Sequence, residues 1–429
     1  MFKKRKITFF LLAALGLAAC AASTTSAEGT AADADELSID NLRRLWRGTI
    51  DRSVVDPFNP WAQTKLGLGE EYILPGEAAE FATFASQVRD IQREAQEKSG
   101  KPTLNRAFHA KSHACVRGEL SLDPKELSAD RRIGLFQSAA KYVTYARFSN
   151  GVGDVQSDKK MDIRGLALKI LGVKGIRVLS RPGDDTATTQ DFLMGSTPFA
   201  PASDARHMMA FGVASKTAPN GTSILGRVEN LVQLGRILTK DENVRIVDFL
   251  LNHALPGSKA MGSALGASFY TGAPNALGLQ AGDVNTARAK GAFKLMAKTG
   301  VITGDACVPV VQAPDSDANF LRADLQARFA SSKVCVELYA QFQRDGFADP
   351  LEDVSVDWKA PFVRVGRLVF EPQDLSAETA ATAACNAFSF TPWHTIADHR
   401  PLGNGMRARR LALTSSAEFR GANMTEPTE

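Results

Sequence analysis

The feature that most restricts the fold of this chain is a set of segments in which polar and apolar residues alternate. They comprise residues 106–123, 141–150, 162–180, 331–343 and 361–371. Alternation with a period of two, with many β-branched and aromatic residues, is typical of strands. A block with helical periodicity, residues 205–264, separates the first three segments from the last two, and a second helical pattern follows at 405–421. This segregation predicts an α+β fold with an antiparallel sheet or barrel at its centre.

The first residues have the pattern of an export signal. Residues 3–6 are all basic, and residues 7–19 form an apolar run that is too short to cross a bilayer as a helix. Small residues then lead into Cys20, as in a bacterial lipoprotein signal, where this cysteine becomes the acylated first residue of the mature chain. An ordinary secretory signal that is cleaved after Ala27 is the alternative. Because Ala21 rather than an acidic residue follows Cys20, we expect a lipid anchor in the outer membrane of a bacterial envelope, facing the periplasm.

Charge balance restricts the partners. The chain has 51 Lys and Arg residues against 47 Asp and Glu residues. The four basic residues at 3–6 account for this excess, because residues 1–19 contain no acid. The mature chain is therefore balanced, and we expect no nucleic-acid partner. No basic segment remains to attract anionic headgroups, so attachment to the membrane would rest on the lipid alone.

Four further cysteines, Cys115, Cys307, Cys335 and Cys385, remain in the mature chain. In an oxidising compartment they can form up to two disulfides, with three pairings that the sequence does not separate. None belongs to a CxxC pair, which argues against a redox motif or a zinc ribbon.

Composition and periodicity divide the region before the strands. Residues 1–19 are the expected signal peptide, and residues 20–35, rich in Ala, Ser, Thr and Glu, are expected to form a flexible tether. A helical segment, residues 36–100, follows, in which Phe81 and Phe84 belong to an apolar stripe that would cover a core.

Five motifs carry a resemblance to a known family. They are RAFHAK at 106–111, RFSN at 147–150, DIRGLALK at 162–169, QDFLMGSTPF at 190–199 and DHRPLGNGMRARRLALTSSAEFR at 398–420. In this order and at these separations they resemble the haem catalases, and most of all their shorter bacterial catalase-like branch. The resemblance implies a catalase-like antiparallel β-barrel with flanking helices and a haem domain at residues 101–425, with residues 205–264 as a helical insertion.

The resemblance implies a distal site with three members. His109 matches the distal histidine that takes and returns a proton, a task that suits imidazole because its usual pKa lies near neutral pH. Ser149 matches the serine that orients this histidine. Ser196 stands where the family has an asparagine, and its shorter side chain still offers one hydrogen bond to a bound peroxide. The implied substrate is a peroxide or an organic hydroperoxide.

Arginines are the implied ligands of the haem carboxylates. Arg106, Arg147 and Arg420 match the family's three propionate-binding arginines, and a guanidinium suits a carboxylate because it is a planar fork that stays charged. Strand alternation places Arg147 and Ser149 on one face. Arg106 and His109 are three residues apart, so they can share a site only if the strand is bulged or begins between them.

The helix expected at 405–421 presents one stripe to the same site. Arg409, Leu413, Ser416 and Arg420 are spaced so that they share one face. In the family, a tyrosine four residues after the first of these arginines is the axial haem ligand. Here that position holds Leu413, which has no lone pair.

The sequence therefore does not identify the axial ligand of a haem bound here. The chain's five tyrosines are all far from this helix in sequence. Water, another donor or a histidine, with His394 and His399 nearest in sequence, are the alternatives. Ordinary catalase turnover is not expected.

Other interpretations stand beside these. An isolated histidine such as His109 is most often a satisfied core residue. His109, His113 and Cys115 on one strand face would make an alternative metal site, although we expect none. Two functions remain: a haem-dependent peroxidase or catalase-like oxidoreductase that uses His109, and a redox-inactive haem-binding or structural lipoprotein, which Leu413 favours. The sequence is compatible with an oligomer but does not set the oligomeric state.

Overall fold

The computed structural model describes residues 65–100, 104–160, 162–178, 186–209, 249, 253–254, 257, 261–375 and 379–427. The expected signal peptide (1–19), the lipidation site Cys20, the tether (20–35) and the helical segment up to residue 64 lie outside these ranges. So does nearly all of the helical block at 205–264.

A closed antiparallel barrel forms the centre of the molecule. Its strands are β1 (Ser112–Leu122), β2 (Ala140–Asn150), β3 (Arg164–Ile170), β4 (Gln190–Gly195), β5 (Ser268–Tyr270), β7 (Ala292–Thr303), β9 (Val334–Phe342) and β10 (Phe362–Phe370). Their spatial order is β5-β4-β3-β2-β1-β10-β9-β7, and pairing of β5 with β7 closes the barrel. The short strands β6 (Asn275–Ala276) and β8 (Ala306–Val308) also pair with β7. The expected α+β fold with a central antiparallel barrel is confirmed.

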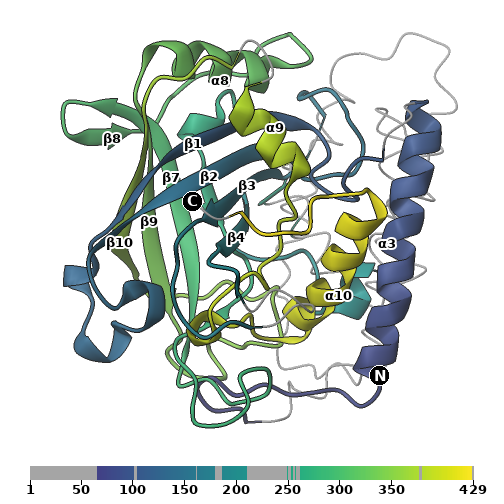
Figure 1. Cartoon of the computed structure of the whole chain (residues 1–429), viewed down its shortest axis with the longest axis vertical. Helices are drawn as coiled ribbons and strands as arrows, with labels where there is room; N and C mark the ends of the chain where they lie inside the picture. Colours follow the sequence, from purple (N-terminus) through teal and green to yellow (C-terminus); the bar gives the residue numbers. More distant parts are fainter. Residues whose placement is uncertain are drawn as a thin grey trace, which may run out of the picture.

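Helices flank the barrel. They are α3 (Glu77–Ser99), α8 (Phe320–Ser331), α9 (Ala380–Ala387) and α10 (Asn404–Phe419). The described residues also form five 3-10 turns: η2 (Pro124–Glu126), η3 (Ala129–Arg131), η4 (Gly134–Phe136), η7 (Ala264–Gly266) and η8 (Ala397–His399). The first three of these follow one another between β1 and β2. Helix α3 runs along one side of the molecule beside α10, and the barrel lies on the other side (Figure 1).

Side-chain alternation builds the barrel core. Val116 and Leu120 of β1, Phe148 of β2, and Leu166 and Leu168 of β3 are all buried in one apolar cluster. Each fully buried side chain of this kind contributes about 1.5–3 kcal/mol through removal of apolar surface from water. Intervening residues of the same strands point to the outer wall, where α9 lies against β1 and β2 and Glu426 of the C-terminal segment reaches Lys169 of β3.

Two strands are shorter than the alternation predicts. The first was expected from Arg106, but β1 begins at Ser112. His109 lies in the left-handed region of backbone conformation, with φ of 57°, and this conformation is incompatible with a strand. The third was expected to reach residue 180, but β3 ends at Ile170.

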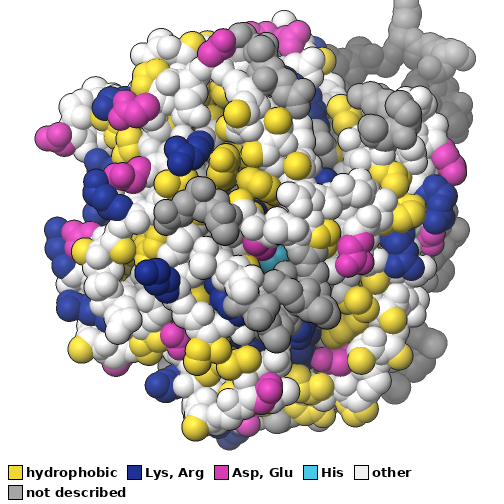
Figure 2. Space-filling model, viewed as in Figure 1, with side chains coloured by type: hydrophobic (Ala, Val, Ile, Leu, Met, Phe, Trp, Pro, Cys, Tyr) yellow, Lys and Arg dark blue, Asp and Glu magenta, His cyan; other side chains and the backbone are white. Residues whose placement is uncertain are grey.

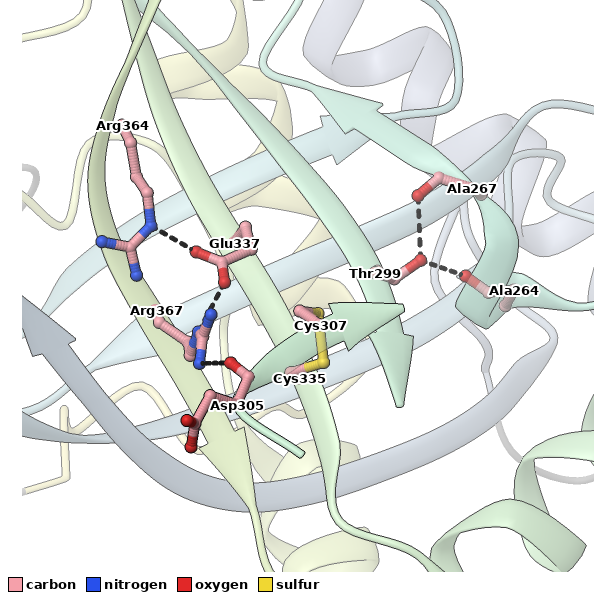
Figure 3. Close-up of a disulfide and its surroundings, with 9 residues drawn as sticks. All are labelled: Ala264, Ala267, Thr299, Asp305, Cys307, Cys335, Glu337, Arg364 and Arg367. Carbon is pink, nitrogen blue, oxygen red and sulfur yellow. Dashed lines mark hydrogen bonds and ion pairs between the residues drawn. A yellow bond between two sulfur atoms is a disulfide. The ribbon is translucent and has the colours of Figure 1, made fainter. Parts of the chain in front are cut away.

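A disulfide fastens one end of the barrel (Figure 3). Cys307 of β8 is bonded to Cys335 of β9. The strand between them, β7, has Gly300 at the crossing, where an added Cβ would lie 2.5 Å from the carbonyl oxygen of Val308. Glycine is therefore required for β8 to cross so closely.

The barrel wall near this disulfide is held by paired charges. Glu337 of β9 accepts hydrogen bonds from Arg364 Nε, at 2.6 Å, and from Arg367 Nε of β10 (Figure 3). Basic and acidic side chains are interspersed over the face shown in Figure 2. No helix in the described part of the chain combines the length and the apolar character of a membrane span.

Candidate functional site

His109 lies in the turn that precedes β1. Its backbone N–H donates to the carbonyl oxygen of Gly151, at 2.9 Å, and the ring Nδ1 lies 3.1 Å from Ser149 Oγ. A non-glycine residue with positive φ is uncommon and stores strain, which is often found at functional positions. The strand begins after both Arg106 and His109, so strand alternation does not force their side chains apart.

Gly165 of β3 provides the space for the His109 ring. A Cβ at this position would lie 2.3 Å from His109 Nδ1 and 2.9 Å from Ser149 Oγ. Gly165 is directly opposite Ser149 in the sheet register. Sequence reasoning missed it as a site residue, although a glycine inside a strand pattern is a recognised sign of a close approach.

Arg147 lies on the same outer face of the barrel as Ser149. Its Nη2 donates to the carbonyl oxygen of His109, at 2.8 Å, so this arginine also fixes the histidine backbone. The Arg147 side chain is only 3% exposed. Its Nε has no hydrogen-bond partner among the described residues, which is costly for a charged group.

Arg106 and Arg420 meet at the C-terminal end of α9. Arg106 Nη2 donates to the carbonyl oxygens of Cys385 and Phe388, at 2.8 and 2.9 Å. Arg420 Nη1 donates to the carbonyl oxygen of Asn386, at 2.9 Å, and Nη2 donates to that of Phe388. The last carbonyls of a helix carry partial negative charge, which favours a nearby cation. This partial charge is weaker than that of a carboxylate, so α9 does not balance the full charge of either arginine.

A disulfide holds α9 in this position. Cys385 of α9 is bonded to Cys115 of β1, which lies opposite Arg147 in the register of β1 and β2. With Cys307–Cys335, this bond fixes one of the three pairings that the sequence left open.

Helix α10 contributes the predicted stripe. The helix is continuous from Asn404 to Phe419, with Arg420 as its C-cap, so Arg409, Leu413 and Arg420 share a face. Arg409 and Arg420 are close enough to the site to act electrostatically on His109 and on Arg147, respectively.

A different side of α10 packs on α3. There Arg89 Nη1 donates to Ser415 Oγ, at 2.5 Å, and Gln92 Nε2 donates to the backbone oxygen of Ser416, at 3.2 Å. The buried Ser416 side chain itself shares the face of Arg409, Leu413 and Arg420. The hydroxyl of Ser415 is thus engaged in helix packing.

Electrostatics at the site are uniformly cationic. Loss of hydration, followed by the neighbouring charges of Arg147, Arg409 and Arg106, lowers the pKa of His109 to about 4. Burial likewise lowers the pKa values of Arg147, Arg409 and Arg420 to about 10. Burial and then the charges of Arg147 and Arg420 lower the pKa of Arg106 well below its usual value. His109 is therefore neutral at physiological pH.

These four arginines differ from Arg400 and Arg407 in having no acid beside them. Elsewhere Arg400 pairs with Glu71, at 2.9 Å, and Arg407 pairs with three carboxylates. Within the described ranges no carboxylate forms an ion pair with Arg106, Arg147, Arg409 or Arg420. The cluster therefore favours an anion that the described part of the chain does not provide.

Ser196 follows β4 and is tied to β3. Its Oγ accepts a hydrogen bond from the backbone N–H of Arg164, at 3.0 Å, and its own N–H donates to the Arg164 carbonyl oxygen, at 2.9 Å. The hydroxyl proton is left for a further acceptor.

The two histidines nearest to α10 in sequence are engaged elsewhere. Nε2 of His399 accepts from the backbone N–H of Leu135, at 2.8 Å, and its Nδ1 lies 3.2 Å from the carbonyl oxygen of Ala276. Both ring nitrogens are thus used, which makes His399 unsuitable as an axial ligand. Nδ1 of His394 is 3.1 Å from Asp191 Oδ2.

The alternative metal site on β1 is wrong. The register shifts between Ser112 and Ala114, and Nε2 of the buried His113 lies 2.8 Å from Asn150 Oδ1. Cys115 is in a disulfide and has no thiolate to offer.

A second cluster of residues that could bind a metal ion already contains a lysine as its cation. Oxygen or nitrogen atoms of Asp191, His394 and Glu426 lie within 4.8 Å of one another. The buried Lys169 Nζ lies 2.9 Å from both Asp191 carboxylate oxygens and 2.5 Å from Glu426 Oε2. Its ammonium already occupies the position that a metal cation would take.

Comparisons with solved structures identify the class of fold. A fungal catalase matches with a TM-score of 0.55 at 17% sequence identity, covering 76% of this chain and 62% of the catalase chain. A bacterial catalase matches with a TM-score of 0.50 at 14% identity, covering 77% of this chain and 60% of the other. The chain thus has a catalase-like fold and spans about three-fifths of the length of these catalases. No protein-family model and no curated protein matches the sequence.

Proposed function

We propose that this protein binds haem in the catalase manner, with its arginines on the haem carboxylates and His109 beside a bound peroxide or hydroperoxide. One observation carries the proposal: four arginines lie at this site without a carboxylate partner in the described part of the chain. Arg106, Arg147 and Arg409 are close enough to act electrostatically on His109, and Arg420 is close enough to act on Arg106 and Arg147. A ligand with two carboxylates on an apolar ring would balance this charge.

The residues fit haem at its carboxylates and on the distal side. Arg147 has a buried, unpartnered Nε, and the weak carbonyl acceptors of Arg106 and Arg420 are readily exchanged for carboxylate oxygens. The fit is missing at the axial position, where Leu413 has no donor atom. A bound haem would supply a redox-active iron for cleavage of the O–O bond.

His109 is suited to move a proton of the substrate. Because its pKa is about 4, the ring is neutral and can accept a proton. Ser149, beside Nδ1, fixes the ring orientation, and Gly165 allows the ring to lie flat against β3. The lowered pKa makes His109 a weak base that returns the proton readily. The Ser196 hydroxyl would orient the substrate.

A second candidate function is a redox-inactive haem-binding or structural protein. Leu413 favours it, because loss of an anionic axial ligand weakens the redox chemistry and leaves carboxylate binding intact. The two candidates differ in peroxide consumption by the haem-loaded protein.

The test is a haemin titration of the full chain, followed by absorption spectroscopy. We expect saturable one-to-one binding with a sharp Soret band. Arg147→Gln should weaken binding about tenfold or more, because it removes a charge-assisted hydrogen bond. Arg364→Gln is the matched control, since Arg364 pairs with Glu337 on the barrel wall. Absence of specific binding in the wild-type chain would leave the structural alternative.

A second measurement separates catalysis from binding. His109→Ala should abolish peroxide consumption and leave haemin affinity nearly unchanged, because His109 donates no charge to the ligand. Equal peroxide consumption by the variant and the wild type would show that His109 is a structural core residue.

Export and lipid attachment belong to the same proposal. The signal pattern at residues 1–19 and Cys20 supports it, as do the two disulfides, which are typical of oxidising compartments. Cys20→Ala should move the protein from the membrane fraction to the soluble fraction of the producing bacterium. Unchanged fractionation would argue for the secretory alternative or for another mode of attachment.

A further inference from the structure

The proposed site has several residues that can bind the haem carboxylates and few that can bind the iron. On the carboxylate side it offers Arg106, Arg147 and Arg420, whose pKa values are lowered by burial and, for Arg106 and Arg147, also by neighbouring guanidinium charges. All three guanidinium groups are held in place, Arg147 by the backbone oxygen of His109 and the other two by the end of α9. A prearranged cationic cluster of this kind binds carboxylates strongly.

On the metal side the described chain offers little. Leu413 is one turn after Arg409 on α10, and its side chain is a hydrocarbon. The nitrogens of His399 are both occupied, and His394 Nδ1 belongs to the Lys169 network. Neither Leu413 nor His399 would therefore give the iron a strong bond.

We infer that this site selects its ligand by the carboxylates rather than by the iron. A metal-free dicarboxylic tetrapyrrole is then accepted about as well as haem, and the ligand class is wider than haem. This inference rests on the proposed function, because it assigns the ligand class of the same site.

The first experiment compares three probes on the unmodified full chain. Haemin is titrated by absorbance, and protoporphyrin IX and its dimethyl ester are titrated by fluorescence. We expect the dissociation constants of haemin and protoporphyrin IX to agree within about tenfold. The ester should bind at least about tenfold more weakly, because its carboxylates are blocked and leave the arginines without charged partners.

Three results distinguish the possibilities. Haemin binding that is more than a hundredfold tighter than protoporphyrin binding would overturn the inference and leave the proposed function standing. Equal binding of the acid and the ester would also overturn it, because recognition would not involve the carboxylates. Failure of both haemin and protoporphyrin IX to bind would overturn the proposed function and the inference together.

A pair of variants supplies the second test. Leu413→Tyr adds an oxygen donor at the axial position and should raise haemin affinity alone, with a shifted Soret band. Leu413→Phe adds a ring of similar size without the donor, so it should change haemin and protoporphyrin affinity in parallel. Parallel changes in both variants would show that Leu413 does not face the metal, and would remove the reason for metal-independent selection.

Discussion

At the scale of single residues, the site depends on one strained backbone position. His109 has φ of 57°, and three contacts hold it there: its N–H to Gly151, its carbonyl oxygen to Arg147, and its ring to Ser149. Such strain persists only where surrounding structure fixes it. The motif RAFHAK indicated the histidine, but its conformation follows from partners on other segments.

Gly165→Ala should disturb this arrangement. The new Cβ would lie 2.3 Å from His109 Nδ1, so the ring must leave Ser149. We expect a loss of about 1–3 kcal/mol in the free energy of unfolding, measured by urea denaturation, and loss of any His109-dependent peroxide consumption. Gly291→Ala is the control, because nothing lies within 4 Å of its added Cβ. Equal effects of the two substitutions would contradict the close approach at Gly165.

Buried neutral histidines should make the fold sensitive to acid. Burial is the main cause that lowers the pKa values of His113 and His399 to about 4. Between pH 6.5 and 4, these two histidines are therefore protonated in the unfolded chain but remain neutral in the folded chain. Their stabilisation is fully present above pH 6.5 and is lost as the pH falls toward 4, by up to about 3 kcal/mol for each residue.

The His399→Gln variant isolates one of these groups. Glutamine retains an acceptor for the Leu135 N–H and a donor for the Ala276 carbonyl oxygen, but it does not titrate. Urea unfolding at pH 7.5, 6 and 5 should show a shallower loss of stability than in the wild type. Parallel curves for the two proteins would show that His399 carries no such linkage.

At the scale of elements, the missed strands have an identifiable cause. Strand β7 is buried on both faces, and it places Lys294 in the interior over the Trp358 ring. Strand β4 buries Gln190 and Asp191. Alternating, β-branched and aromatic residues indicated β1, β2, β3, β9 and β10, although β3 and β9 are also buried on both faces. Strand β4 and the first half of β7 each contain one aromatic and no β-branched residue, so this signal was missing from them. Buried polar residues become compatible with a strand only when their distant partners are known.

The disulfides also required the tertiary structure. Cys115 and Cys385 are 270 residues apart, whereas Cys307 and Cys335 are 28 apart. No local pattern joins α9 to β1. Their proximity follows from closure of the barrel.

Loss of the long-range disulfide should cost more stability than loss of the short-range one. In the chain-entropy account, the difference in loop length corresponds to about 2 kcal/mol. We expect Cys115→Ser with Cys385→Ser to lower the free energy of unfolding by about 2 kcal/mol more than Cys307→Ser with Cys335→Ser. Urea unfolding of both double variants is the measurement. An equal loss in both would indicate that strain or residual structure, rather than loop entropy, sets the contribution of each bond.

At the scale of the whole molecule, ordered motifs from residue 106 to residue 420 predicted the catalase-like fold. The arginine cluster was predicted from the same motifs, because each arginine stands in one of them. The packing of the C-terminal segment against the barrel was not predicted. There Glu426 pairs with the buried Lys169 of β3, which also pairs with Asp191 of β4. A residue in the final segment gives no sequence signal of such a partner.

Lys169 is therefore expected to join the barrel to the C-terminal segment. Lys169→Met would leave the carboxylates of Asp191 and Glu426 buried without their cation, although His394 is close to both. Breaking a buried ion pair from one side costs about 3–5 kcal/mol, so we expect a loss of this size at pH 7 in thermal or urea unfolding. The loss should be smaller at pH 5, because a proton taken up by the network replaces the missing positive charge.

Lys294→Met is the matched control for this substitution. Lys294 is similarly buried, but burial lowers its pKa to about 8, against the weaker opposite effect of Asp357, Asp353 and Asp349. Its Nζ donates to the Val356 carbonyl oxygen, at 3.4 Å, lies over the Trp358 ring, and forms no ion pair with a described residue. Replacing it by a side chain of similar length leaves no ion pair broken, so the expected loss is well below that of Lys169→Met at both pH values. If the two variants lose equal stability, with the same dependence on pH, the cost lies in packing of the side-chain stem. In that case the paired charges would not be what fastens the C-terminal segment to the barrel.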